Sequence, residues 1–201
     1  MNPYINPMTY KCGWLKDIII NLLNEYSENS SKMDVMDLGS GQGLDSKILS
    51  TIFKKVYSIE PSDNMLEWAR KHKKSLIKKF PDMEKNLSKI RFMKGDFKNI
   101  PIKQVDFMLL KNTIHLSNNI EENLDNIIKH ISENGFLLII EPTKNSRFSN
   151  KISKKELNKK INKVQKTEAS IRKYITKNKK IKLLGKKKII YSKNVWFLKK
   201  I

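Results

Sequence analysis

The sequence predicts an α/β fold in which a mostly parallel sheet is covered by helices. Short apolar runs alternate with segments of helical periodicity between residues 14 and 140, a pattern typical of parallel strands joined by helical crossovers. A loop with three glycines follows the first apolar run, and two β-rich runs close the chain. Together these features predict seven strands in one sheet.

The first half of the chain contains three of the predicted strands. Apolar residues within 14–27 recur at the spacing of an amphipathic helix. The strands are expected at 33–38, 55–60 and 90–94, and helical spacing returns after the first two of them, from Leu44 and from Met65 onwards. Strand and helix therefore alternate twice before the third strand.

The second half continues the alternation and then changes. Strands are expected at 105–110 and 136–140, with a helix over 120–131 between them. An apolar stripe over 157–175 predicts a lysine-rich helix, and runs at 182–191 and 195–198 read as strands. Only three residues separate those two strands, too few for a crossover helix, so an antiparallel hairpin at the sheet's edge is expected.

Length and composition indicate one intracellular domain. The 201 residues suffice for one core but not two, so we expect a single domain over 1–201. Its parts are an N-terminal helix and lid (1–30), a cofactor-binding core (31–150) and a basic helix with a terminal hairpin (151–201). Cys12 is the only cysteine, which excludes an internal disulfide and a cysteine metal cluster. The apolar stretch at 17–23 is too short to span a bilayer, so we expect a cytoplasmic protein without a membrane partner or a bound metal.

The net charge of +21 is concentrated at the end of the chain. Residues 1–150 hold 22 Lys and Arg against 18 Asp and Glu, whereas residues 151–201 hold 19 against 2. Such a block can neutralise the phosphates of a nucleic acid. An AT-rich coding sequence is the alternative explanation, because only four of the 41 cationic residues are arginine.

The glycine loop favours a nucleotide-like cofactor with a positive charge. Glycines at 39, 41 and 43 allow a tight turn and let a ligand lie against the main chain. A dinucleotide fingerprint would place its third glycine one residue later, and a P-loop would need Gly-Lys-Ser/Thr. Asp37 precedes the first glycine by two residues and could bind an ammonium group.

The order of Asp37, one spacer residue and three alternate glycines resembles the cofactor motif of class I S-adenosylmethionine-dependent methyltransferases. Residues 60–70 resemble the corresponding segment of the type 11, small-molecule branch of these enzymes. The resemblance covers about residues 33–142 and implies a Rossmann-like, doubly wound, seven-stranded sheet. It implies that Glu60 accepts hydrogen bonds from the ribose and Asp96 from the adenine amino group, while Phe97 covers the ring. The full set of expected contacts to S-adenosyl-L-methionine is Asp37, Gly39, Ser40, Gly41, Gly43, Glu60, Pro61, Met65, Asp96, Phe97 and Lys111.

The candidate catalytic residue is His115, just beyond the fourth strand. Open α/β folds bind ligands at this edge, and histidine titrates near neutrality, which suits a general base. His72 and His130 lie among polar helical residues and are expected to be solvated. Aromatic residues near the N-terminus are expected to form a lid over the cofactor, namely Tyr4, Tyr10 and Trp14; a hydrophobic-staple or core role is the alternative.

We therefore predict a methyltransferase, monomeric or homodimeric, that acts on a small-molecule acceptor. One alternative is an RNA-directed methyltransferase whose basic C-terminal region holds phosphates. The other is a catalytically inactive partner protein with the same fold. The exocyclic-amine signature Asn/Asp-Pro-Pro-aromatic does not follow the fourth strand, which argues against that group of nucleic-acid enzymes.

Overall fold

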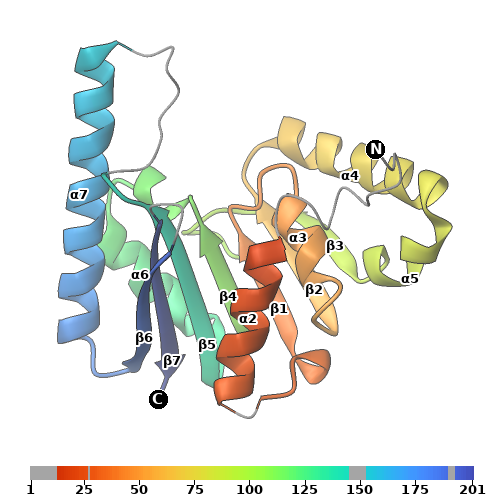
Figure 1. The fold of residues 1–201 in the computed structure, drawn as a ribbon, viewed down its shortest axis with the longest axis horizontal. Coiled ribbons are helices and arrows are strands. Elements are labelled where there is room, and N and C mark those ends of the chain that lie inside the picture. The colour runs from red at the N-terminus through yellow and green to blue at the C-terminus, as the bar shows by residue number, and fades with distance from the viewer. Residues whose placement is uncertain (1–12, 27, 145–152, 190–192) are drawn as a thin grey trace. The chain divides into compact units, whose positions relative to one another are not determined.

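The computed structural model describes residues 13–26, 28–144, 153–189 and 193–201 (Figure 1). Its seven strands form one sheet in the order β3-β2-β1-β4-β5-β7-β6. The strands are β1 (Asp34–Leu38), β2 (Lys55–Glu60), β3 (Ile90–Lys94), β4 (Val105–Lys111), β5 (Ile131–Pro142), β6 (Ile181–Ile189) and β7 (Lys193–Lys200). β2 pairs in parallel with β1 and β3, whereas β7 pairs antiparallel with β5 and β6. The predicted α/β, Rossmann-like sheet and its C-terminal hairpin are confirmed.

The chain folds as two compact units, residues 1–105 and 106–201. The first contains β1 to β3 with helices α2 (Gly13–Glu25), α3 (Leu44–Leu49), α4 (Asp63–Lys79) and α5 (Glu84–Leu87). α2 buries one apolar stripe, which includes Leu15, Ile19 and Leu23, as expected for an amphipathic helix. Ser62 caps α4 by accepting a hydrogen bond from the backbone N–H of Met65 at 3.4 Å. That cap starts α4 directly after the end of β2.

The second unit contains the remaining strands with α6 (Ile120–Lys129), α7 (Lys154–Lys177) and the short 3-10 helix η3 (Ile114–Leu116). α7 begins with a capping box, in which Ser153 and Glu156 bind each other's backbone N–H groups. It packs against α6 and β6 (Figure 1). Phe136 of β5 stacks on Phe197 of β7, with ring centroids 5.2 Å apart. The antiparallel strands are thus joined by a packed aromatic core.

Several element ends differ from the prediction. β5 begins at Ile131 rather than at Phe136, because the polar residues before Phe136 are also extended, except at Asn134, where φ is 63°. No helix within the described residues is long and apolar enough to cross a membrane. The expectation of a single domain over 1–201 stays a prediction.

Candidate functional site

The three glycines after β1 have backbone angles in the left-handed region. φ is 79° at Gly39, 53° at Gly41 and 67° at Gly43, values that residues with a Cβ rarely adopt. Gly39 donates its backbone N–H to the carbonyl of Ile59 at 2.9 Å, which ties the loop to β2. A Cβ at Gly43 would lie 2.7 Å from the Phe92 ring, whereas nothing lies within 4 Å of a Cβ at Gly41. The loop therefore needs glycine for its turn and leaves room beside Gly41 for a ligand.

Asp37 stands at the buried start of the loop, with 2% of its surface exposed. The Ser46 hydroxyl donates to Asp37 Oδ2 at 2.6 Å. The Ser58 hydroxyl lies 2.8 Å from that of Ser46 and 2.8 Å from that of Ser40. A chain of hydroxyl groups thus connects the carboxylate to the glycine loop and fixes its orientation, because a buried carboxylate needs hydrogen-bond donors.

Glu60 is the last residue of β2, and its carboxylate binds the backbone of two segments, the glycine loop and the turn before α4. Its Oε2 accepts from the N–H of Gly41 at 2.8 Å, and its Oε1 accepts from the N–H of Ser62 at 3.1 Å. A carboxylate has about four lone-pair sites, so both oxygens keep acceptor capacity for a diol. Next to it, Pro61 and Met65 are exposed. Glu60 therefore links the glycine loop to the start of α4 at the place expected for a ribose.

Asp96 lies in the loop after β3 and is exposed. Its Oδ1 accepts from the N–H groups of Lys98 and Asn99, both at 2.8 Å. This is turn capping, which was the alternative to an adenine contact. Among the described residues nothing binds Oδ2, which stays available to a donor such as an amino group. Phe97 follows and is partly exposed.

Lys47 of α3 is buried against the glycine loop, with 1% of its surface exposed. Its Nζ donates to the carbonyl of Gln42 at 3.2 Å and lies 3.1 Å from His72 Nδ1 and 5.6 Å from the centre of the Trp68 ring. Burial lowers the pKa of Lys47 from 10.5 to about 8. Burial and the nearby ammonium group also lower the pKa of His72. The expectation that His72 is solvated is wrong, because its partly buried ring contacts both Lys47 and Trp68.

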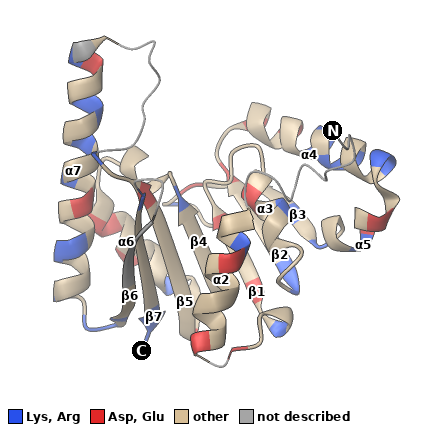
Figure 2. Ribbon diagram, viewed as in Figure 1, with Lys and Arg blue, Asp and Glu red and all other residues tan. Residues whose placement is uncertain are grey.

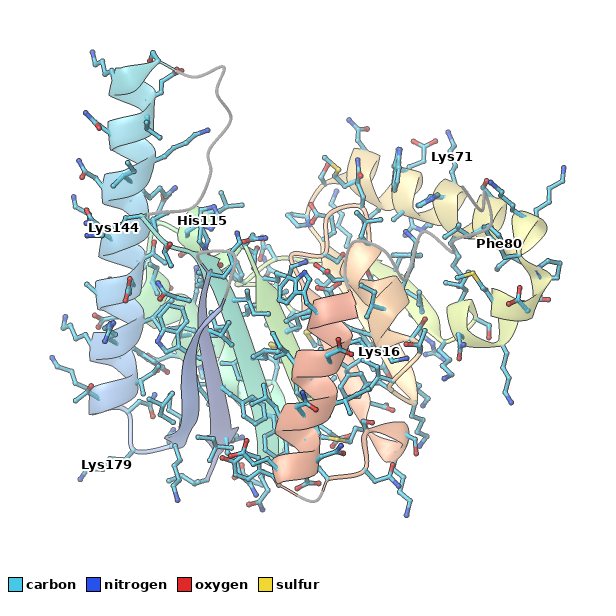
Figure 3. The ribbon with its side chains drawn as sticks, in the orientation of Figure 1. Lys16, Lys71, Phe80, His115, Lys144 and Lys179 are labelled. Atoms are coloured by element: carbon cyan, nitrogen blue, oxygen red, sulfur yellow. The ribbon has the colours of Figure 1, made fainter. Side chains whose placement is uncertain are left out.

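His115 lies on η3 beyond the end of β4 (Figure 3). Its Nδ1 is 2.5 Å from Oε2 of Glu141, which is 2% exposed. Oε1 of the same carboxylate accepts from the N–H groups of Thr113 and Ile114 at 2.8 and 2.9 Å. A carboxylate can only accept, so Nδ1 donates to it, and Nε2 presents a lone pair when the ring carries a single proton. Glu141 therefore holds both the ring and its backbone.

A small pocket adjoins this pair, with α7 as one wall. The residues that line it are His115, Glu141, Pro142, Val164, Thr167, Glu168 and Trp196. Lys193 lies near it and donates to Asn112 Oδ1 at 2.8 Å. Burial, and to a lesser degree Lys111, lower the pKa of Lys193, while Glu141 acts to raise it. Lys111 itself ends β4 and is partly exposed.

The predicted cofactor residues of the first unit do come together locally. Backbone and side-chain hydrogen bonds join the glycine loop to Asp37 and Glu60. Lys111 and His115 belong to the second unit. Trp14 is partly buried in the first turn of α2, and the expected lid residues Tyr4 and Tyr10 lie outside the described residues.

Sequence reasoning missed the partners of these residues. Glu141 follows the apolar run 136–140, and an acid at the end of a buried strand, as Glu60 is at the end of β2, was the signal that could have identified it. Ser46 and Ser58 carry no pattern of their own, because their contact with Asp37 arises from the fold. Lys47 reads as a solvated helical lysine, although it is buried.

Comparison with known proteins places the chain in a family. Residues 29–192 match the family model described as a methyltransferase domain. A SAM-dependent methyltransferase from Aquifex aeolicus is 19% identical, with 90% of this chain and 89% of that one covered and a TM-score of 0.69. The plantazolicin methyltransferase BpumL, in complex with a monoazolic desmethylPZN analog and SAH, is 16% identical over 94% and 85% of the two chains (TM-score 0.66). Magnesium protoporphyrin IX methyltransferase from Synechocystis PCC 6803, with bound SAM, is 15% identical over 94% and 79% (TM-score 0.65). No match is found among curated protein sequences.

Proposed function

The chain belongs to the methyltransferase domain family and has the class I fold, and on that premise we propose that it transfers a methyl group from its cofactor, S-adenosylmethionine, to a small-molecule acceptor. Two similar structures support this acceptor class, since BpumL is a plantazolicin methyltransferase and the Synechocystis enzyme acts on magnesium protoporphyrin IX.

The residues of the first unit suit this cofactor. The open space beside Gly41 admits a ligand against the main chain, and the buried carboxylate of Asp37 is suited to an ammonium group. Glu60 has acceptor capacity left for a ribose diol, and Asp96 Oδ2 for an amino group. We assign these residues to the methionine, ribose and adenine ends of the cofactor, in that order. Ser40, Pro61, Met65 and Phe97 complete the proposed site, with Lys111 as a further candidate.

The observation that carries the proposed catalytic role is the contact between His115 and Glu141 beside a small pocket. The sulfonium of the bound cofactor supplies an activated methyl group and its own leaving group, so the protein mainly orients the acceptor and removes a proton. His115 Nε2 takes the proton from the acceptor's hydroxyl or amine as the new bond to the methyl carbon forms. Glu141 stabilises the imidazolium that results. His115 is thus the proposed base and Glu141 its positioning residue.

A label-transfer experiment tests the proposal. Cofactor with a radioactive methyl group is incubated with the protein and either a small-molecule extract or total RNA. Label in the small-molecule fraction is expected, with the rate constant kcat in the His115→Ala variant lower by about 100-fold or more, the usual contribution of a general base. Label in RNA alone would favour the RNA-directed alternative, and no transfer to either would favour the inactive partner. An unchanged kcat in the variant at saturating cofactor would exclude His115 as the base.

A further inference from the structure

One face of α7 carries a row of lysines, which we name the α7 lysine face: Lys155, Lys159, Lys163 and Lys166. All four are exposed, and their spacing of four, four and three residues puts them on the same side of the helix. Figure 2 shows basic residues along the length of α7. A shallow, open depression runs over this face and is also lined by Glu156, Asn158 and Asn162.

The charge of the α7 lysine face is not neutralised locally. No acidic side chain among the described residues pairs with any of its four ammonium groups. The two acids of α7 bind other partners: Glu156, which also lines the depression, binds Ser153 in the capping box, and Glu168 binds Arg172 and Asn194. The row is therefore a field of positive charge along more than two helical turns.

Codon bias alone does not produce this arrangement. A bias toward lysine acts on the whole chain, yet residues 1–150 balance 22 basic residues with 18 acidic ones. Residues 151–201 contain 19 basic residues and only two acidic ones. The local features are thus an excess of basic residues and a loss of acids, and a polyanionic partner explains both, whereas a lysine bias that acts on the whole chain does not.

A lipid surface fits this helix poorly. A helix that lies in a membrane interface keeps its apolar face free for the acyl chains. The apolar side chains Val164, Ile171 and Tyr174 of α7 are instead buried in the second unit, and none of the large exposed apolar residues in the described part of the chain lies on α7. The partner should therefore be recognised by charge and hydrogen bonds.

We propose that the α7 lysine face binds the phosphodiester backbone of a nucleic acid without reading its sequence. Ammonium groups four residues apart repeat about every 6 Å along a helix, which lets several of them meet successive phosphates of one strand. The amides of Asn158 and Asn162 add donors of the kind that contact phosphate oxygens. No aromatic side chain lies among the residues lining the depression, so base stacking contributes nothing to the expected affinity.

This surface is independent of the proposed acceptor pocket, although the same helix forms both. Val164 and Thr167 of α7 line the pocket beside His115, while the lysines stand on another side of the helix. Binding therefore needs neither cofactor nor methyl transfer. The His115→Ala variant should bind nucleic acid like the wild-type protein, which separates a failure of this proposal from a failure of the proposed function.

The test is fluorescence anisotropy with a labelled 20-nucleotide RNA of mixed sequence, a single-stranded DNA and a DNA duplex, each between 50 and 200 mM salt. A quadruple Lys→Gln variant of the α7 lysine face is compared with a control variant that loses four exposed lysines of the first unit, Lys54, Lys74, Lys78 and Lys85. Both variants lose the same net charge. Circular dichroism establishes that both remain folded.

Four phosphate contacts to a single strand predict a slope of about −2.8 in log affinity against log salt, hence about a 50-fold loss over this range. The variant of the α7 lysine face should bind at least tenfold more weakly at 50 mM salt, and its affinity should no longer fall with salt along this slope. The control variant should keep nearly the wild-type affinity and slope. Similar binding of the single strands and the duplex supports backbone recognition. Equal losses in both variants, no binding at 50 mM salt, or binding of anionic lipid vesicles but not of nucleic acid would each overturn the proposal.

Discussion

Replacing Glu141 by glutamine tests the pair that the proposed chemistry depends on. The carboxylate accepts three hydrogen bonds, from Thr113 N, Ile114 N and His115 Nδ1. A glutamine oxygen can keep the two backbone bonds, but its amide nitrogen then faces Nδ1 and donates to it. The histidine proton would move to Nε2, and the lone pair that serves as the base would be lost.

The contacts of Glu141 determine how much stability and how much activity this substitution should remove. Exchanging the charged acceptor of the His115 hydrogen bond for a neutral amide should lower the free energy of unfolding by about 1 kcal/mol, because hydrogen bonds to charged groups contribute more than neutral ones. Loss of the base should lower kcat by about 100-fold or more, while the affinity for S-adenosylhomocysteine stays unchanged. Urea denaturation, steady-state methyl transfer and calorimetric titration measure the three quantities.

A matched control is Glu133→Gln on the same strand, which removes an equal charge from an exposed carboxylate that pairs with the largely buried Lys200. Lys200 keeps its hydrogen bond to the carbonyl of Ile131 at 2.9 Å, so this variant should lose little stability and keep its kcat. If Glu141→Gln kept the wild-type kcat, the positioning role of Glu141 would be refuted. If Glu133→Gln lowered the free energy of unfolding and kcat as much as Glu141→Gln does, the effect would come from the lost charge and not from the histidine contact.

Three further predictions concern the first unit. Lys47 has a pKa of about 8 in the folded protein against 10.5 ordinarily, so the unfolded state binds more protons between these values. The wild-type unfolding free energy should rise by about 3 kcal/mol relative to Lys47→Met from pH 8 to 10.5; a pH-independent difference in urea denaturation would contradict this. Gly43→Ala should unfold at a lower temperature than Gly41→Ala, because both are strained at positive φ but only the first meets a ring at 2.7 Å; equal melting temperatures would argue against the close packing. Glu60→Gln should weaken S-adenosylhomocysteine binding by about tenfold, or 1.4 kcal/mol, and an unchanged calorimetric affinity would remove Glu60 from the cofactor site.

The fold was predictable because its signals are local. Strand and helix periods, the glycine loop and the short connection before Val195 each depend on neighbouring residues, and the sheet and hairpin follow from them. The start of β5 was not predictable, because residues 132–135 are polar and lack the apolar pattern of a buried strand. Strand pairing outweighed that local preference.

The site was predictable only in part, for a physical reason. Asp37 and Glu60 belong to the stretch that resembles the methyltransferase cofactor motif, so the sequence identified them. Their partners come from elsewhere: Glu141 is 26 residues from His115, and His72 is 25 residues from Lys47. Burial of Lys47 depends on how α3 and α4 pack, which helical periodicity does not specify.

The proposed cofactor site at the glycine loop is tested most directly by a crystal structure of the protein with S-adenosylhomocysteine. The ribose hydroxyls are expected within hydrogen-bond distance of the Glu60 carboxylate. The ligand's ammonium group should lie beside Asp37, and the ligand should contact the protein main chain at Gly41. A ligand bound away from residues 37–43 and Glu60, or no binding at millimolar concentration, would contradict the assignment.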